Sequence, residues 1–167
     1  MLGLLFVLLA VAHAVEWPAS CYEETSFVYG GSGSTFTVCE CSEVGEFDVS
    51  GRTSIPENAF SNCDEVTAIR GLDSVTSIGD DAFSGTGITS FAWPTGAREI
   101  SSSTFSGCSG LTSITGLESV TSIGIAAFAY TGFTSFAWPT GAAEIKASTF
   151  GGCSGLTSIT GLESVTS

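Results

Sequence analysis

Histidine, cysteine and carboxylate side chains are the groups in this chain whose types could support catalysis or metal binding. His13 is the one histidine among 167 residues, so general acid–base work elsewhere would fall to carboxylates. Two pairs of glutamates recur 45 residues apart, which is typical of a repeated surface and not of groups that converge on one substrate. The pairs are Glu99 with Glu144 and Glu118 with Glu163. With no Ser/His/Asp set and no glycine-rich phosphate loop, we expect no enzymatic activity and no cofactor.

Three cysteines, Cys21, Cys39 and Cys41, precede the first basic residue and could form a disulfide or bind zinc. A Cys-x-Cys pair without histidine is a weak zinc signature, so we expect no metal site. In an oxidising compartment, a disulfide from Cys21 to either Cys39 or Cys41 would leave one thiol unpaired. These three residues are therefore the disulfide candidates.

Residues 1–14 have the pattern of a signal peptide. The apolar run Leu2–Val11 is followed by His13 between two alanines, which are the small residues of a cleavage site. The run is too short to cross a bilayer, and no later stretch approaches the length of a span. We expect cleavage after Ala14, a secreted or cell-surface location and no membrane insertion of the mature chain. A buried N-terminal strand or a short membrane anchor is the alternative.

The chain is strongly acidic, with four basic residues against seventeen acidic ones and a net charge of −13. Such a charge disfavours binding to nucleic acid or to anionic lipid. Residues 15–50 contain acidic side chains and the three cysteines but no basic residue, so we interpret them as an N-terminal cap. Disorder does not explain the remainder, because Phe, Ile, Leu, Val and Trp recur there at fixed intervals.

An internal repeat decides the fold class. The 15 residues CSGLTSITGLESVTS occur twice, starting at Cys108 and at Cys153, which gives a period of 45 residues. Phenylalanines at spacings of 23, 22, 23 and 22 divide each period in two; they are Phe60, Phe83, Phe105, Phe128 and Phe150. A unit of 22–23 residues cannot bury its own apolar face, whereas stacked units can, and this length suits a leucine-rich repeat. We predict a solenoid over residues 51–167, with a parallel β-sheet on one face and short helical, 3-10 or irregular returns on the other.

Each coil should contribute one strand to a single continuous sheet. The expected strands are 66–70, 88–92, 111–115, 133–137 and 156–160, with a capping strand at 47–49. Side chains alternate across a strand, so the residue two places after each inward Ile or Phe also points inward. That residue alternates between Gly and Trp, and we interpret the glycine coils as making room for the rings of Trp93 and Trp138.

The segments SIGDDAFSGTGITSFAWP (77–94) and SVTSIGIAAFAYTGFTSFAWP (119–139) resemble the BspA-like leucine-rich repeat, and the resemblance covers about residues 54–167. Thr86 and Thr131 depart from it by replacing the cysteine in alternate units, where Trp-Pro also replaces Ile-Pro. The resemblance implies a surface-exposed or secreted protein, often linked with adhesion to host or matrix proteins, and it supplies no catalytic residue. Because the sequence stops at Ser167, before the next Ile and Phe, we expect a fragment of a longer protein.

Cys63, Cys108 and Cys153 recur at the 45-residue period and so should lie two coils apart. At about 4.8 Å per strand that separation is roughly 9–10 Å, which exceeds the reach of a disulfide. We expect these three residues to be buried and unpaired.

The outer face of the sheet is the remaining candidate for a functional surface, because solenoids commonly bind partners there. Its expected contact residues are Arg70, Ser90, Ser113, Thr115, Ser135, Ser158 and Thr160. The hypothesis is a module that binds an extracellular protein or glycan. The alternatives are a structural cell-surface repeat protein and an ice- or crystal-binding solenoid that uses its Ser and Thr ladders.

Overall fold

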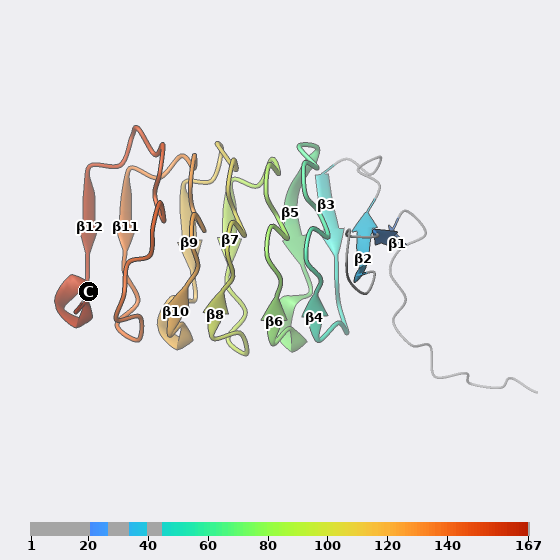
Figure 1. Cartoon of the computed structure of the whole chain (residues 1–167), viewed down its shortest axis with the longest axis horizontal. Coiled ribbons are helices and arrows are strands. Elements are labelled where there is room, and N and C mark those ends of the chain that lie inside the picture. Colours follow the sequence, from blue (N-terminus) through green and yellow to red (C-terminus); the bar gives the residue numbers. More distant parts are fainter. Residues whose placement is uncertain (1–20, 27–33, 40–44, 167) are drawn as a thin grey trace, which may run out of the picture.

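The computed structural model describes residues 21–26, 34–39 and 45–166, with side chains from residue 45 onward. The expected signal peptide and Cys41 lie outside these residues. Before the repeats, β1 (Cys21–Ser26) and β2 (Ser34–Cys39) form an antiparallel pair in which Cys21 lies opposite Cys39. From residue 45 onward the chain winds into a stack of coils, as Figure 1 shows.

The strands of the predicted sheet lie on one side of this stack and are parallel, as the sequence predicts. They are β3 (Gly45–Asp48), β5 (Val66–Arg70), β7 (Ser90–Ala92), β9 (Ser113–Thr115), β11 (Ser135–Ala137) and β12 (Ser158–Thr160). A second row, which the sequence analysis did not foresee as strands, comprises β4 (Ser54–Ile55), β6 (Ser77–Ile78), β8 (Glu99–Ile100) and β10 (Ser122–Ile123). Each short strand in this second row ends on an isoleucine, and that isoleucine is buried. Two 3-10 turns, η1 (Leu72–Ser74) and η2 (Leu117–Ser119), connect the two rows in alternate coils, and a third, η3 (Leu162–Ser164), follows β12 at the equivalent position.

The expectation of one continuous sheet is wrong. Among the described residues the main strands form three separate two-stranded ladders, β3–β5, β7–β9 and β11–β12, and Figure 1 shows them in pairs. Phe91 pairs with Ile114, 23 residues later, whereas no ladder joins Ile114 to Phe136, 22 residues later. The second row follows the same rule, since β4–β6 and β8–β10 pair and β6–β8 do not. The β3–β5 ladder is an exception, because its strands pair at the shorter, 22-residue spacing. This ladder contains a register shift after Gly45.

The returns that contain the phenylalanines are hydrogen-bonded from coil to coil without such interruptions. The backbone N–H of Phe60 donates to Ala82 at 2.8 Å, that of Phe83 to Thr104 at 3.0 Å, and those of Phe105 and Phe128 continue the series. In every coil the residues two before and two after the phenylalanine are left-handed, with φ between 53° and 77°. They are Asn58 and Asn62, Asp81 and Gly85, Ser103 and Gly107, Ala126 and Tyr130, and Ser148 and Gly152. This alternation points every second N–H of the return at the next coil.

The phenylalanines form the buried column that their spacing predicts. Successive rings from Phe60 to Phe150 are stacked, with centroids 5.5–5.8 Å apart and planes within 5–21° of each other. The first four rings are fully buried and Phe150 is half-buried. Phe91 packs edge-on against Phe105, and Phe136 against Phe150, so the column joins the return to the strand side of the core.

The two tryptophans are buried, as expected, but the glycines beside them have a different role from the one predicted. Trp93 donates through Nε1 to the carbonyl of Ala97 at 2.9 Å, and Trp138 makes the equivalent bond to Ala142. Gly116 is left-handed, with φ 79°, and a Cβ there would come within 2.6 Å of the Trp93 carbonyl oxygen. Gly161 has the same relation to Trp138. The glycine is therefore required by backbone conformation and close backbone approach, not by room for the ring.

Removing a central ring of the phenylalanine column should strongly destabilise the fold. Phe105→Ala leaves a cavity between two stacked neighbours and should lower the free energy of unfolding by about 3–5 kcal/mol. Phe150→Ala, at a half-buried position, should cost clearly less. Urea unfolding followed by circular dichroism measures both, and an equal loss for the two variants would contradict the buried-column description.

Candidate functional site

The sheet face comprises the seven residues expected to contact a partner, and all seven side chains are exposed. Arg70 ends β5 and Ser90 begins β7, while Ser113 and Thr115 flank Ile114 on β9. Ser135, Ser158 and Thr160 occupy the equivalent exposed positions on β11 and β12. Within each ladder these residues lie in register, with Ser90 opposite Ser113 and Ser135 opposite Ser158.

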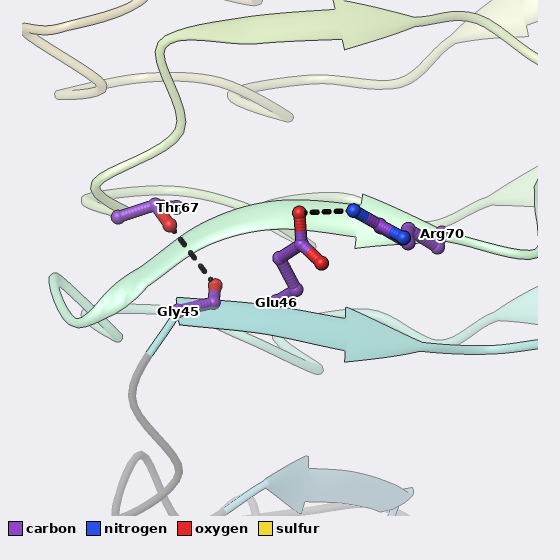
Figure 2. A network of polar contacts seen from close by, with 4 residues as sticks. All are labelled: Gly45, Glu46, Thr67 and Arg70. Carbon is purple, nitrogen blue, oxygen red and sulfur yellow. Dashed lines mark hydrogen bonds and ion pairs between the residues drawn. The ribbon is translucent and has the colours of Figure 1, made fainter.

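Arg70 is the one cation of the sheet face, and it already has an anionic partner. Figure 2 shows its guanidinium on β5 directed at the carboxylate of Glu46 on β3, with which it forms an ion pair. Both side chains are largely exposed, so the pair should contribute little stability. Nearby, hydrogen bonds from the Ser50 hydroxyl and N–H, with a smaller contribution from Arg70, lower the pKa of Asp48. At this end of the face Arg70 neutralises Glu46, whereas the carboxylate of Asp48 keeps its negative charge.

A column of threonines borders the sheet face and was missed as a structural feature by the sequence analysis. Thr67 donates to the Gly45 carbonyl at 3.1 Å (Figure 2), and Thr157 donates to that of Thr134 at 3.0 Å. Thr112 makes the corresponding contact with Thr89, at 3.4 Å. A Thr-Ser pair that recurs at 89–90, 112–113, 134–135 and 157–158 is the signal that could have revealed the column, although in the first coil Thr67 is followed by Ala68.

The serines of the sheet face are not used in this way. In the described part of the chain, the hydroxyls of Ser90, Ser113, Ser135 and Ser158 make no hydrogen bond to other protein groups. These exposed hydroxyls therefore retain their full capacity to donate to, and accept from, a partner.

Two shallow depressions lie on the same side of the solenoid, each at a junction where the main strands are unpaired. One, of about 370 Å³, lies between β5 and β7 and is bordered by Arg70, Asp73, Trp93 and Thr95. The other, of about 170 Å³, lies between β9 and β11 and is bordered by Ser113, Ile114, Ser135 and Phe136. Because backbone pairing is absent at these two junctions, the sheet face has a depression once every two coils.

The repeat cysteines differ from one another, and the expectation that Cys63 is unpaired is wrong. Cys63 is disulfide-bonded, whereas Cys108 and Cys153 are free thiols, so its partner is neither of them. The spacing of the repeat cysteines excludes only bonds among them and does not bear on a partner outside the repeats. The disulfide candidates Cys21, Cys39 and Cys41 have no described side chains.

The free thiols take part in a buried ladder with the threonines that replace cysteine in alternate coils. The Cys108 thiol lies 3.2 Å from the hydroxyl of Thr86 and 3.0 Å from the carbonyl oxygen of Phe83. Burial raises the pKa of the Cys108 thiol, which keeps it protonated and unreactive. Cys153 and Thr131 repeat the arrangement. These hydrogen bonds join neighbouring coils, and Cys153 is less deeply buried than Cys108.

No group of three or more His, Cys, Asp or Glu side chains in the described ranges could hold a metal ion. None of the helices described there is long and apolar enough to cross a bilayer.

Together, the stacked 22–23-residue coils and their exposed strand face define a leucine-rich-repeat solenoid. A family model described as the BspA type leucine rich repeat region matches the chain in six copies, over residues 34–157 and 121–167. The chain belongs to this family.

Two solved structures are similar to the chain. A leucine-rich repeat protein from Bacteroides ovatus ATCC 8483 has 24% identity and a TM-score of 0.65, over 82% of this chain and 39% of that one. A leucine rich cell surface protein from Faecalibacterium prausnitzii A2-165 has 30% identity and a TM-score of 0.64, over 72% of this chain and 33% of that one. The chain therefore spans well under half the length of either protein. A comparison with curated proteins finds no match.

The disulfide of Cys63 gives a test of how the first coil is held. Reduction should lower the free energy of unfolding by about 2–4 kcal/mol, because it releases a constraint on the unfolded chain. Without reductant, mass spectrometry after alkylation in denaturant should find Cys108 and Cys153 modified and Cys63 protected. Modification of all three residues would contradict the assignment.

Asp81 gives a test of the electrostatics of the returns. Its carboxyl is partly buried beside Asp80 and Glu57, and burial followed by these two charges raises the pKa of Asp81. A raised pKa in the folded state means that ionised Asp81 opposes folding at neutral pH, and that the opposition fades as pH falls through this pKa. Asp81→Asn, which also suits the left-handed backbone, should therefore raise the melting temperature at pH 7 and lose this advantage in acid. Thermal unfolding at both pH values measures it; a stability loss at pH 7 would contradict the sign.

Proposed function

We propose that this chain is an extracellular interaction module that adheres to a protein or glycan partner through its sheet face. The observation that carries the proposal is the set of exposed serine hydroxyls, held in register on paired strands and free of internal hydrogen bonds. A rigid backbone presents them, so little conformational entropy is lost on binding. The description of a 30% identical relative as a cell surface protein supports the location.

The character of the face also indicates how binding would be distributed. Apart from Arg70 it has no charge, and it lacks exposed aromatic anchors, so each coil should contribute weakly. Useful affinity would then come from several coils acting together. The depressions at unpaired junctions supply the relief that a partner could fit, once every two coils.

An ice- or crystal-binding role, which the Ser and Thr ladders also suggest, is less well supported. Matching a crystal lattice needs an even repeat along the face. The alternation of paired and unpaired strands breaks that repeat between β5 and β7 and again between β9 and β11.

The test places charged, bulky side chains on the sheet face. The double variant Ser113→Arg and Ser158→Arg should reduce adhesion to immobilised basement-membrane matrix or mucin by about tenfold or more, because the face would lose its fit. The matched control is Ser109→Arg with Ser154→Arg, which are also 45 residues apart and exposed but lie before the strands. Equal loss in both double variants, or no loss in the first, would contradict the assignment of the face.

A further inference from the structure

One return of the solenoid contains a residue that its backbone disfavours. In every coil the residue two places after the phenylalanine is left-handed, and four of the five are Gly or Asn: Asn62, Gly85, Gly107 and Gly152. The fifth is Tyr130, with φ 56°. Glycine and asparagine tolerate this conformation, whereas a bulky aromatic residue there is strained. The fold itself therefore selects against tyrosine at this position, which suggests that the side chain serves a surface function.

A second position of the same return also carries a larger and more apolar residue than the equivalent positions of the other coils. Three places before the phenylalanine, the other coils have Glu57, Asp80, Ser102 and Ala147, whereas this coil has Ile125. Ile125 is 53% exposed and Tyr130 is 65% exposed. Two large side chains with apolar surface are thus presented to solvent on one return, between neighbouring returns whose equivalent residues are small.

The tyrosine ring packs against the backbone of the next coil. A Cβ on Gly152 would come within 2.4 Å of ring carbons Cδ1 and Cε1 of Tyr130, so the ring lies directly over that glycine. The Tyr130 N–H also donates to the carbonyl of Gly151 at 2.7 Å. The next coil therefore supports the ring, which remains open to solvent over most of its surface.

The return that carries the ring has no charged residue, whereas the next coil carries Lys146, whose ammonium donates to the hydroxyl of Ser122 at 3.3 Å. Residues 119–143 contain no Asp, Glu, Lys or Arg, and neither do residues 147–162. The acidic returns lie toward the other end of the described coils, at Glu57, Asp80 and Asp81. Hydroxyl side chains flank the ring's coil on both sides, including Ser103 and Ser106 in one neighbour and Ser148 in the other.

We propose that Tyr130 and Ile125 form a stacking platform for a neutral saccharide, distinct from the sheet face. A sugar ring has an apolar C–H face and hydroxyl edges, which match a supported aromatic ring with serines on the neighbouring returns. The ring's own return carries no charge to bind an ionic ligand, and the net charge of −13 disfavours acidic glycans. Two apolar side chains bounded by small ones are also too little for a protein interface, which buries about 800 Å² on each side.

The experiment separates binding from stability. The chain is titrated by calorimetry with cellohexaose, chitohexaose, mannohexaose and maltohexaose, and with polygalacturonate as an acidic control. At least one neutral hexasaccharide should bind and polygalacturonate should not. Tyr130→Gly, which installs the residue found in three other coils, should weaken that binding by about tenfold or more without lowering the melting temperature. Ile125→Ser should weaken it too, and Tyr130→Phe should preserve it.

Several results would overturn the proposal. They are failure of all four neutral hexasaccharides to bind, binding unchanged in Tyr130→Gly, and a melting temperature several degrees lower in that variant, which would make the ring a structural cover for Gly152. Self-association of the chain that Tyr130→Gly abolishes would assign the surface to a second copy instead. The arginine variants of the sheet face should bind the saccharide normally, so failure of this proposal and failure of the adhesion proposal can be told apart.

Discussion

Hydrogen bonds between successive phenylalanine returns are the interaction on which the rest of this solenoid depends. They join all the described coils from Phe60 to Phe150, whereas the strand ladders stop at every second junction. Each return has left-handed residues on both sides of its phenylalanine, and this conformation directs its N–H groups along the stack. The same backbone positions the phenylalanine rings one above another. Backbone pairing and ring stacking thus reinforce each other on the return side.

The alternation of 22- and 23-residue coils explains why the strands are less regular than the returns. Both coil lengths keep the return bonds, as Phe60 to Ala82 and Phe83 to Thr104 show. The difference of one residue is therefore absorbed elsewhere, and it appears where Ile114 and Phe136 fail to pair. The interrupted face gains depressions that a uniform sheet would lack. In this way a constraint on the core side shapes the surface proposed to bind a partner.

Much of this fold could be predicted from the sequence because the repeat encodes it directly. The spacing of Phe83, Phe105 and Phe128 was sufficient to predict a stacked column, and the apolar alternation located β5 at its observed bounds. The break in the sheet was not predicted, because the 22/23 spacing shows that alternate coils differ by one residue but not whether the strands or the returns absorb the difference. The disulfide of Cys63 was missed because the 45-residue period excludes a bond only to the other repeat cysteines.

The surface, too, was predicted in part from the sequence and in part was not. Alternation of side chains along a strand was enough to place Ser113 and Ser158 on the exposed face. The unusual position of Tyr130 was not recognised from sequence, although Gly or Asn at the equivalent position of the other four coils is the signal of a left-handed backbone. Once the backbone is known, the comparison of equivalent coils identifies the exception. Repeat proteins allow this kind of inference because each coil serves as a reference for the others.

Amide hydrogen exchange measured by NMR tests most directly whether the returns, and not the sheet, hold the coils together. The N–H groups of Phe83, Phe105 and Phe128 should be among the slowest to exchange, because they open only when the stack itself opens. The N–H groups of Ser135 and Ala137, which face an unpaired junction, should exchange much faster. Strand amides more protected than those of the returns, or equal protection across the β9–β11 junction, would contradict this account.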